Sequence, residues 1–468
     1  MKTSERIIKE LDPILKPKSI ALVGASKEPQ KWGNVVLRNL VTRGYKGKVY
    51  PVNPNCDEIN GMRCYSSLTD IQDDLDCVYI AVPAPIVPNI LKQCAEKKVK
   101  GVIIISGGFA EKDEEGKKLE EELVNIARKG GFRILGPNTM GVYSGSTNMN
   151  ATFTSFAPKS GNIAFISQSG YFGGQLFSIA NSEDIGFSMF VNVGNQSDIQ
   201  IHEVIAYLGF EENTKVITLY IEGLKNGKEF IETCREIAKK KPIIAYKAGK
   251  SAIGTRAARS HTASLAGNDQ IYDAAFKKAG VIRVSESYHL FECGNALALQ
   301  PPSKGNRIGI VSSSGGLCVS ASDLTNELGL NIPTLDEETR LLVRKFLSPH
   351  ASEPYNPIDT AGDLRSTIYP QIAEILLGKR YIDALIVAPT FGLVDSTETL
   401  NEELDASNRL GELQKKYGKP IIVSLSNPNI KSAKTIKSLG IPIYRTPEQC
   451  VRALYSLYEY GQIKYSLK

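Results

Sequence analysis

Short apolar segments alternate with longer amphipathic segments along the chain. In the first part, apolar and mostly β-branched runs predict strands at 18–23, 49–52, 76–82, 102–106 and 133–135. Between these runs, the helical spacing of apolar residues predicts helices at 34–43, 86–97 and 114–129. Strands that are apolar on both faces and alternate with helices form parallel sheets. The pattern therefore predicts a doubly wound α/β domain at 1–150.

The rest of the chain repeats this plan. Strands are predicted at 162–167, 187–193, 216–221 and 243–246 and, after the linker Gln300-Pro301-Pro302-Ser303, at 307–312, 384–388 and 420–424. The openings of the two parts are similar, GNIAFISQSGYFG at 161–173 and GNRIGIVSSSGGL at 305–317. Both run from Gly-Asn through an apolar strand to a Ser-x-Ser-Gly turn. We interpret them as duplicated flavodoxin-like domains at 151–302 and 303–468, although so short a similarity also arises by chance.

Composition narrows the class of protein. The formal net charge of +6 is small for 468 residues, and the positive residues are mixed with acidic ones, so no nucleic-acid partner is predicted. Eight cysteines occur singly, without C-x-x-C pairs or histidines at metal-ligand spacing, which favours free thiols in a reducing cytosol and no metal site. The amino terminus has no signal-peptide core, and no apolar run is long enough to span a bilayer. We therefore expect a cytoplasmic protein without membrane contact.

Small and polar residues follow the predicted strands of the first domain, at the sheet edge where doubly wound folds bind ligands. The first turn reads GASKEPQKWG, which lacks the G-x-G-x-x-G spacing and contains Lys27 and Lys31. The second strand ends in Asn53 instead of the acidic residue that grips a ribose. A phosphorylated adenine nucleotide other than NAD fits better, because lysines complement phosphates. A nicotinamide-dependent oxidoreductase is the weaker alternative.

One long loop, at 242–269, contains His261. The loop follows an apolar strand, precedes a helix expected to be capped by Asn268 and Asp269, and carries the cations Lys247, Lys250, Arg256 and Arg259. An imidazole on a cation-rich loop suits a nucleophile that accepts a phosphoryl group, since the cations offset the charge that it acquires. A solvated basic loop whose histidine hydrogen-bonds a neighbour explains the same pattern.

Two serine–glycine turns and one carboxylate accompany this histidine. The turns are Ser167-Gln168-Ser169-Gly170 and Ser313-Ser314-Gly315-Gly316, each at a predicted helix start. Free N–H groups there form an anion site, and the two turns could face one phosphate from opposite sides; many such turns merely cap helices. Glu222 ends the strand at 216–221. It could accept a hydrogen bond from Nδ1–H of an imidazole and leave Nε2 as the nucleophile, or be only solvated or ion-paired.

Taken in order, the motifs resemble a known family. They are GAS…KWG, VYPVNPN, AVP, SGGF, GPNTMG, SQSG, IEG, SHTASLAG, SSSGG and NPIDTAGD. This series, which extends over nearly the whole chain, resembles the α subunit of ADP-forming acetyl-CoA (acyl-CoA) synthetases, in the succinyl-CoA synthetase superfamily. The resemblance implies a Rossmann-like CoA-binding domain followed by two flavodoxin-like ligase domains with parallel sheets.

The resemblance also implies a reaction and its residues. Acyl-CoA, phosphate and ADP would give a small organic acid, ATP and CoA, reversibly, through an acyl phosphate and a phosphohistidine at His261 that Glu222 orients. The two serine–glycine turns would hold phosphate, and Asn138 and Thr139 would lie near the acyl and phosphate groups. The residues implied for CoA are Gly24, Ala25, Ser26, Lys27, Lys31, Gly33, Asn53, Val82, Pro83, Ser106, Gly107 and Phe109.

The nucleotide is expected on a partner. The three predicted domains use the whole chain, which leaves no room for the ATP-grasp fold that binds nucleotide in this superfamily, and no P-loop motif occurs. A separate ATP-grasp β subunit would therefore bind ADP and Mg²⁺, in an α₂β₂ assembly, and the loop would carry His261 to it. The alternatives are a succinyl-CoA synthetase-type subunit, which the third domain disfavours, and a non-catalytic CoA-binding regulatory protein.

Overall fold

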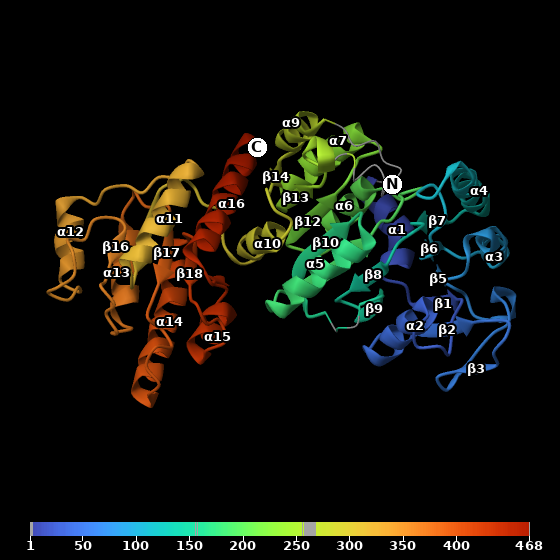
Figure 1. The fold of residues 1–468 in the computed structure, drawn as a ribbon, viewed down its shortest axis with the longest axis horizontal. Coiled ribbons are helices and arrows are strands. Elements are labelled where there is room, and N and C mark those ends of the chain that lie inside the picture. Colours follow the sequence, from blue (N-terminus) through green and yellow to red (C-terminus); the bar gives the residue numbers. More distant parts are fainter. Residues whose placement is uncertain (1–2, 155, 157, 255, 257–267, 468) are drawn as a thin grey trace. The chain divides into compact units, whose positions relative to one another are not determined.

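The structure is a computed structural model that describes residues 3–154, 156, 158–254, 256 and 268–467 (Figure 1). It divides into two compact units, Met1–Phe291 and Glu292–Lys468. Each unit is an α/β structure built on parallel strands, which confirms the predicted fold class. Within the described parts of the chain, none of the helices combines the length and the apolar character that crossing a bilayer requires.

The first unit begins with a five-stranded parallel sheet in the order β2-β1-β5-β6-β7. Its strands are β1 Ser19–Val23, β2 Lys48–Val52, β5 Cys77–Ile80, β6 Gly101–Ile104 and β7 Arg133–Leu135. Its helices are α1 Thr3–Leu15, α2 Trp32–Thr42, α3 Val87–Glu96 and α4 Glu114–Gly130, and a small hairpin is formed by β3 Glu58–Ile59 and β4 Met62–Arg63. The five strands and the last three helices lie where the apolar pattern predicts them.

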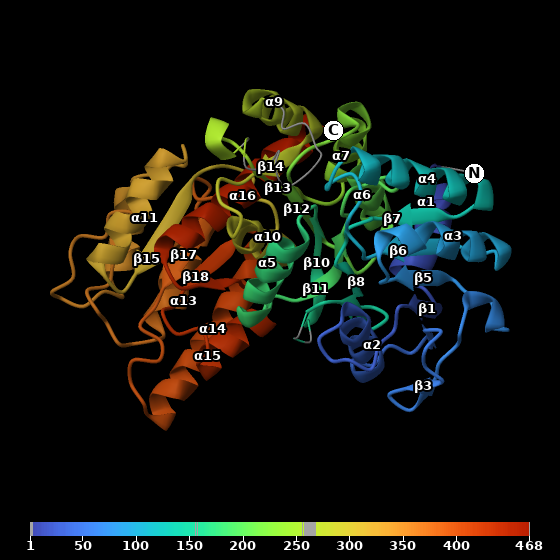
Figure 2. The same ribbon diagram turned by 45° about the vertical axis from the view of Figure 1, so that its right-hand side comes forward.

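A seven-stranded sheet completes the first unit, in the order β14-β13-β12-β10-β11-β8-β9. Its parallel strands are β10 Ser160–Ser167, β11 Phe187–Asn192, β12 Val216–Ile221, β13 Ile243–Lys247 and β14 Val281–Arg283. The hairpin of β8 Gly141–Ser144 and β9 Met149–Thr152 joins antiparallel to β11, so the segment that follows the first sheet forms the edge of the second. The helices are α5 Gly170–Ser182, α6 Ile201–Phe210, α7 Gly227–Ala238 and α9 Asp269–Ala279. In both ribbon views α5 lies beside β10 (Figures 1 and 2).

The second unit contains a five-stranded parallel sheet in the order β16-β15-β17-β18-β19. The strands are β15 Ile308–Ser312, β16 Ile358–Asp359, β17 Ala384–Ala388, β18 Ile421–Ser424 and β19 Ile443–Tyr444. The helices are α11 Gly315–Glu327, α12 Glu337–Arg344, α13 Ile368–Gly378, α14 Thr397–Tyr417, α15 Lys431–Ser438 and α16 Pro447–Ser466, while α10 His289–Leu299 contains the division between the units. This unit has its own core, with Leu376 and Tyr369 of α13 fully buried.

Aromatic side chains form part of the hydrophobic core around the seven-stranded sheet. Phe177 of α5 stacks on Phe190 of β11 with ring centroids 4.8 Å apart and ring planes 11° apart, and both side chains are fully buried. The ring centroid of Phe165 in β10 lies 5.4 Å from that of Phe190 and 5.1 Å from that of Phe291. Each fully buried phenylalanine contributes roughly 1.5–3 kcal/mol of hydrophobic stabilisation. This core packs the middle of α5 against β11.

Three sets of contacts join the two sheets of the first unit. Helix α1 packs on α6, and α2 packs on β9, where Asn39 Nδ2 donates to the carbonyls of Thr152 and Thr154. The segment 195–199 runs antiparallel along the outer edge of β7, with N–H bonds from Asn195, Ser197 and Ile199 to the carbonyls of Pro137, Gly136 and Ile134. The two sheets are thus tied together beside the carboxyl end of β7.

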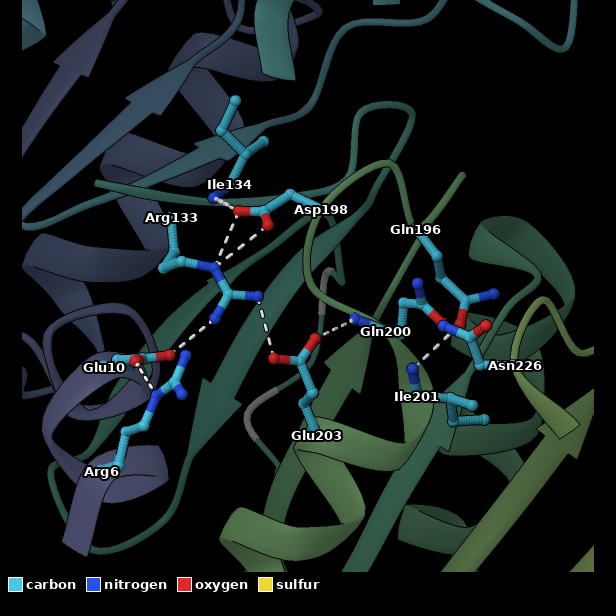
Figure 3. Close-up of polar contacts among 10 residues, drawn as sticks. All are labelled: Arg6, Glu10, Arg133, Ile134, Gln196, Asp198, Gln200, Ile201, Glu203 and Asn226. Carbon is cyan, nitrogen blue, oxygen red and sulfur yellow. Dashed lines mark hydrogen bonds and ion pairs between the residues drawn. The ribbon is translucent and has the colours of Figure 1, made fainter. Parts of the chain in front are cut away.

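The side chain of Arg133 connects several elements at this junction (Figure 3). Its guanidinium donates to Glu10 of α1 at 2.7 Å, to Asp198 at 3.0 and 3.1 Å and to Glu203 of α6 at 2.9 Å. Asp198 also accepts the backbone N–H of Ile134 at 2.8 Å. One arginine therefore connects α1, β7, α6 and the 195–199 segment.

Candidate functional site

A cleft of about 1790 Å³ opens at the carboxyl edge of the first sheet, in the first unit. One wall comes from the first sheet and contains Val82, Pro83, Ser106, Gly107, Asn138 and Thr139. The other wall comes from the second sheet and contains Gln168, Ser169, Gly170, Glu222 and Gly223. The fold therefore brings together, in one cleft, residues predicted to contact CoA, phosphate and the acyl group.

The turn between β10 and α5 presents the start of a helix to the cleft. Ser167 is buried, and its hydroxyl donates to the carbonyl of Ser169 at 2.7 Å, which tightens the turn. Ser169 is the N-cap residue of α5, but its side chain accepts no capping hydrogen bond. The first N–H groups of a helix lack partners within the helix and attract anions. Consequently this turn has the geometry expected of an anion site.

Gln168 is positioned differently from its neighbours in the turn. Its Nε2 donates to the carbonyl of Gly223 at 2.6 Å, and its Oε1 accepts the N–H groups of Glu222 and Gly223, the latter at 2.9 Å. Both ends of the amide are therefore bonded to the backbone that follows β12. Gln168 fixes Glu222 beside the turn, a contact that sequence spacing does not reveal.

Glu222 is buried, with 6% of its surface exposed, and it affects the ionisable groups around it. Burial and then the charge of Glu222 raise the pKa of the Tyr220 hydroxyl. Burial lowers the pKa of Lys247, which is 1% exposed, while the charges of Asp269 and Glu222 oppose that shift. Lys247 ends β13, the strand that pairs with β12, and its Nζ lies 4.6 Å from the ring centroid of Tyr272. A carboxylate and a lysine are thus held at neighbouring strand ends.

Asn192, which the sequence analysis did not single out, links the two walls. Its Nδ2 donates to the carbonyl of Ser167 at 2.8 Å, and its Oδ1 accepts the N–H of Met140 at 2.7 Å. The buried Thr139 donates its hydroxyl to the carbonyl of Asn192. Asn138 has a φ of 59° and extends into the cleft, where its Nδ2 lies 3.4 Å from Oδ1 of Asn195. Thr139 therefore supports the wall while Asn138 is accessible.

The segment Gly194 to Ser197 forms part of the cleft wall and was also missed. Asn195 Nδ2 donates to Glu111 at 2.6 Å and to Glu120 at 2.8 Å. Glu111 in turn accepts the N–H groups of Gly108 and Phe109. The available signal was the polar run GNQSD directly after a predicted strand, a position that often carries function in α/β folds.

The residues expected to contact CoA divide into two groups. Val82, Pro83, Ser106 and Gly107 line the cleft. The others are absent from its lining: Gly24, Ala25, Ser26, Lys27, Lys31, Gly33, Asn53 and Phe109. Among these, Phe109 is fully buried, whereas Lys27 is exposed and Lys31 is ion-paired with Glu28 at 2.5 Å. Asn53 Nδ2 donates to the carbonyl of Ala25 at 2.7 Å, which stabilises the first turn.

The glycines of the first turn have a packing role. Gly24 has a φ of 88°, a conformation that side chains disfavour. A Cβ at Gly33 would lie 2.0 Å from the carbonyl oxygen of Gly24, so only glycine permits α2 to start so close to the turn. This approach places Trp32 at the cleft, where its ring stacks on Phe153 with centroids 4.3 Å apart.

The second serine–glycine turn lies in the second unit and repeats the hydrogen bonding of the first. Ser312 Oγ donates to the carbonyl of Ser314 at 3.1 Å, and Ser314 is the N-cap of α11 without a side-chain cap bond. Gly315 and Gly316 then begin α11. The two turns belong to different units, and a phosphate shared by them stays a prediction. His261 lies in 257–267, outside the described residues.

Comparison with known proteins identifies the family. Residues 18–145 match the family model described as CoA binding domain, and residues 160–297 match that of the succinyl-CoA ligase like flavodoxin domain. The chain is 42% identical over 453 residues to the acetate–CoA ligase [ADP-forming] II subunit alpha of Pyrococcus furiosus, covering 96% of this chain and 97% of that relative. It is 38% identical to the acetate–CoA ligase [ADP-forming] of Methanocaldococcus jannaschii, covering 97% of this chain but 64% of that longer relative.

A solved structure agrees over the same length. The dinucleotide forming acetyl-coenzyme A synthetase 1 of Ca. Korarchaeum cryptofilum, in complex with phosphate and ADP, is 34% identical with a TM-score of 0.87, and 98% of each chain is covered. Full-length similarity at this level, together with both family models, goes well beyond a shared fold. The chain belongs to the family of the α subunits of ADP-forming acetate–CoA ligases.

Proposed function

We propose that this chain carries out the acyl-transfer and first phosphoryl-transfer steps of an ADP-forming acetate–CoA ligase, with His261 as the phosphate carrier. The observation that supports this most strongly is the single cleft that contains the α5 turn, Glu222 and the strand ends expected to bind CoA. Acetate is the first acid to test, because the relatives described above are named for it.

The proposed reaction uses the two walls in sequence. Phosphate held at the amino-terminal end of α5 attacks the thioester carbonyl of acyl-CoA, the C–S bond breaks, and CoA leaves as the thiolate. Nε2 of His261 then attacks phosphorus, and the acid leaves as the carboxylate. The N–H groups at the start of α5 offset the charge on the phosphate oxygens.

Glu222 is proposed to orient the phosphate carrier. Gln168 bonds to both backbone N–H groups at 222 and 223, so the carboxylate lies beside the phosphate turn. A carboxylate that accepts Nδ1–H fixes the tautomer in which Nε2 is the nucleophile. Asn138 is proposed to contact the acyl phosphate, because its side chain extends into the cleft beside Asn195.

The final transfer to ADP is proposed to take place on a partner subunit. The Pyrococcus furiosus relative is named a subunit, and the Methanocaldococcus jannaschii relative extends well beyond the matched region. Both observations support a partner that completes the enzyme. We propose that the partner is an ATP-grasp β subunit that binds ADP with Mg²⁺ in an α₂β₂ assembly, which co-expression and native mass spectrometry would test.

The carrier assignment is tested by phosphorylation of the purified chain. Incubation with ³²P-labelled acetyl phosphate should give an acid-labile, base-stable label on the wild-type chain and on the control His350→Ala, which changes an exposed histidine. His261→Ala should carry none. Glu222→Gln should be labelled at least tenfold more slowly, since it retains shape and loses charge, about 1.4 kcal/mol or more of activation free energy. Label retained in His261→Ala would refute the assignment.

A further inference from the structure

Lys225 stands out among the charged residues of the cleft. Five carboxylates line the described part of the cleft, on Asp113, Glu114, Glu120, Glu121 and Glu222, against three lysines, Lys112, Lys117 and Lys225. Phosphate, acyl phosphate and the acid are all anions, so a wall with this excess of carboxylates needs a positive charge close to where they bind.

Two of the three lysines are ion-paired with carboxylates that also line the cleft. Lys112 pairs with Asp113 at 3.4 Å, and Lys117 pairs with Glu114 at 3.6 Å. Within the part of the chain that the structure describes, Lys225 is the one lining lysine without an ion pair within 4 Å. It remains accessible in the cleft, while burial by the surrounding walls lowers the pKa of its amine and the charge of Glu120 partly opposes that shift.

The loop between β12 and α7 holds Lys225 in a defined position. Gln168 bonds to the backbone at 222 and 223, and the N–H of Leu224 donates to the Tyr272 hydroxyl at 3.1 Å. Asn226 Nδ2 donates to Gln200 Oε1 at 3.0 Å, as Figure 3 shows. The residues on both sides of Lys225 are thus anchored, so its backbone needs no rearrangement when a ligand binds.

The Lys225 amine is also directed by one contact. Its Nζ donates to the carbonyl of Gln196 at 3.0 Å. Gln196 is itself fixed, because its Oε1 accepts the N–H of Ile201 at 2.9 Å (Figure 3). An ammonium group has three protons, and a single carbonyl satisfies one of them. The amine therefore retains donors for an anion in the cleft, whose lining also includes Asn195 and Asn138.

We propose that Lys225 binds inorganic phosphate in this cleft and supplies the positive charge that holds it for attack on the thioester. The proposal rests on the proposed function and deepens it, because it names the group that recognises the phosphate substrate. The binding site would be formed by the Lys225 ammonium and the first turn of α5. The Glu222 carboxylate, which is proposed to orient His261, would contact the phosphohistidine and not free phosphate.

Phosphate binding by the full chain tests the proposal without turnover. Equilibrium dialysis with ³²P-labelled inorganic phosphate should show a Kd about tenfold to a hundredfold weaker for Lys225→Met than for wild type, the usual effect of losing a hydrogen bond to a charged group. Lys225→Arg keeps the charge and should restore most of the affinity. Lys228→Met, which removes an exposed charge three residues further on in α7, is the matched control and should bind as wild type.

The outcomes separate this proposal from the proposed function. Unchanged phosphate binding in Lys225→Met, or equal loss in Lys228→Met, would overturn the Lys225 assignment. An effect on the KM for the organic acid, with unchanged phosphate binding, would show that the lysine recognises the carboxylate and would also overturn it. If phosphate binding depends on Lys225 but no label from acetyl phosphate reaches His261, the Lys225 site stands and the phosphohistidine mechanism falls.

Discussion

Individual amide side chains determine how the cleft is assembled. Gln168 bonds to the backbone at 222 and 223, and Asn192 joins Ser167 to Met140. Buried amides carry two donors and an acceptor with two lone pairs, and satisfying them fixes the segments that they connect. The relative positions of the turn between β10 and α5, Glu222 and Asn138 therefore depend on residues that need not touch a substrate.

Trp32 offers a direct report on ligand binding. It is the only tryptophan in the chain, it is 55% exposed, and it lines the cleft while stacked on Phe153. We predict that CoA shifts tryptophan emission to shorter wavelength, because a ligand in the cleft removes water from the ring. Fluorescence titration measures this shift, and Trp32→Phe, which keeps the stacking, should bind CoA with the signal abolished. Binding seen by calorimetry without any emission change would contradict the placement of CoA beside Trp32.

At the scale of elements, the junction between the first two sheets shapes one side of the cleft. The 195–199 segment runs along β7, and β7 leads directly into Asn138 and Thr139. Arg133 holds this arrangement by contacts with Glu10, Asp198 and Glu203. The position of the cleft wall that contains Asn195 therefore depends on these ion pairs and backbone hydrogen bonds.

Removing Arg133 should loosen this junction. Arg133→Met leaves three partly buried carboxylates without their common partner, so we predict a loss of about 2–4 kcal/mol in the free energy of unfolding. Urea denaturation measures the loss, and Arg128→Met, at an exposed position in the last turn of α4, is the control. A loss below about 0.5 kcal/mol, which is the usual effect of a surface substitution, would mean that the network does not stabilise the fold.

The same network has a defined pH dependence. Burial acts to raise the pKa of Glu10, but its hydrogen bond to Arg6 and the charge of Arg133 outweigh this, and the net pKa is lowered. A carboxyl group whose folded pKa is depressed stabilises the fold above its unfolded pKa, and this contribution is lost as pH falls through the folded pKa. The difference in stability between wild type and Arg133→Met should therefore shrink in acid.

At the scale of the whole molecule, the chain has two units with separate cores. Leu376 of α13 is fully buried in the second unit, whereas Trp32 and the cleft belong to the first. Leu376→Ala should lower the stability of the second unit by about 2–5 kcal/mol, through lost burial and the cavity left behind. Calorimetry should show a lower melting temperature for that unit.

CoA binding gives the second part of this prediction. The tryptophan emission shift with CoA should keep its wild-type midpoint in Leu376→Ala, because every residue of the cleft lies in Met1–Phe291. The conservative change Leu376→Met should leave both stability and binding nearly unchanged. A weakened CoA midpoint in Leu376→Ala would show instead that the units are energetically coupled.

The regular elements were largely predictable from local pattern. The strand β17 was expected at 384–388 and is found there, and Asn268 caps α9 through the N–H of Gln270 as the sequence indicates. The hairpin β8–β9 was not anticipated, because short polar strands such as Met149–Thr152 have no distinct apolar repeat. The hairpin joins the second sheet through β8, which pairs with β11, a neighbour that is distant in the sequence.

The residues of the candidate site also divide into those that the sequence predicted and those that it did not. Ser169 and Gly170 were identified by their position at a helix start, Ser106 and Asn138 were implied by the family resemblance, and all four line the cleft. Phe109 shares the SGGF motif with Ser106 but is fully buried in the core. Lys225 and Asn192 carried no motif that pointed to the cleft, and Asn195 was marked only by the polar run GNQSD after a predicted strand.

The sequence by itself determined the α/β class, the position of most strands, the serine–glycine turns at the helix starts and the family to which the chain belongs, since all of these follow from local composition, spacing and motif order. The tertiary structure alone decided which loops meet in the cleft, which amides connect its walls and which lysine remains without an ion pair among the described lining residues. Local patterns are set by neighbours along the chain, whereas the charge balance and geometry of a cleft depend on residues that are brought together only by folding.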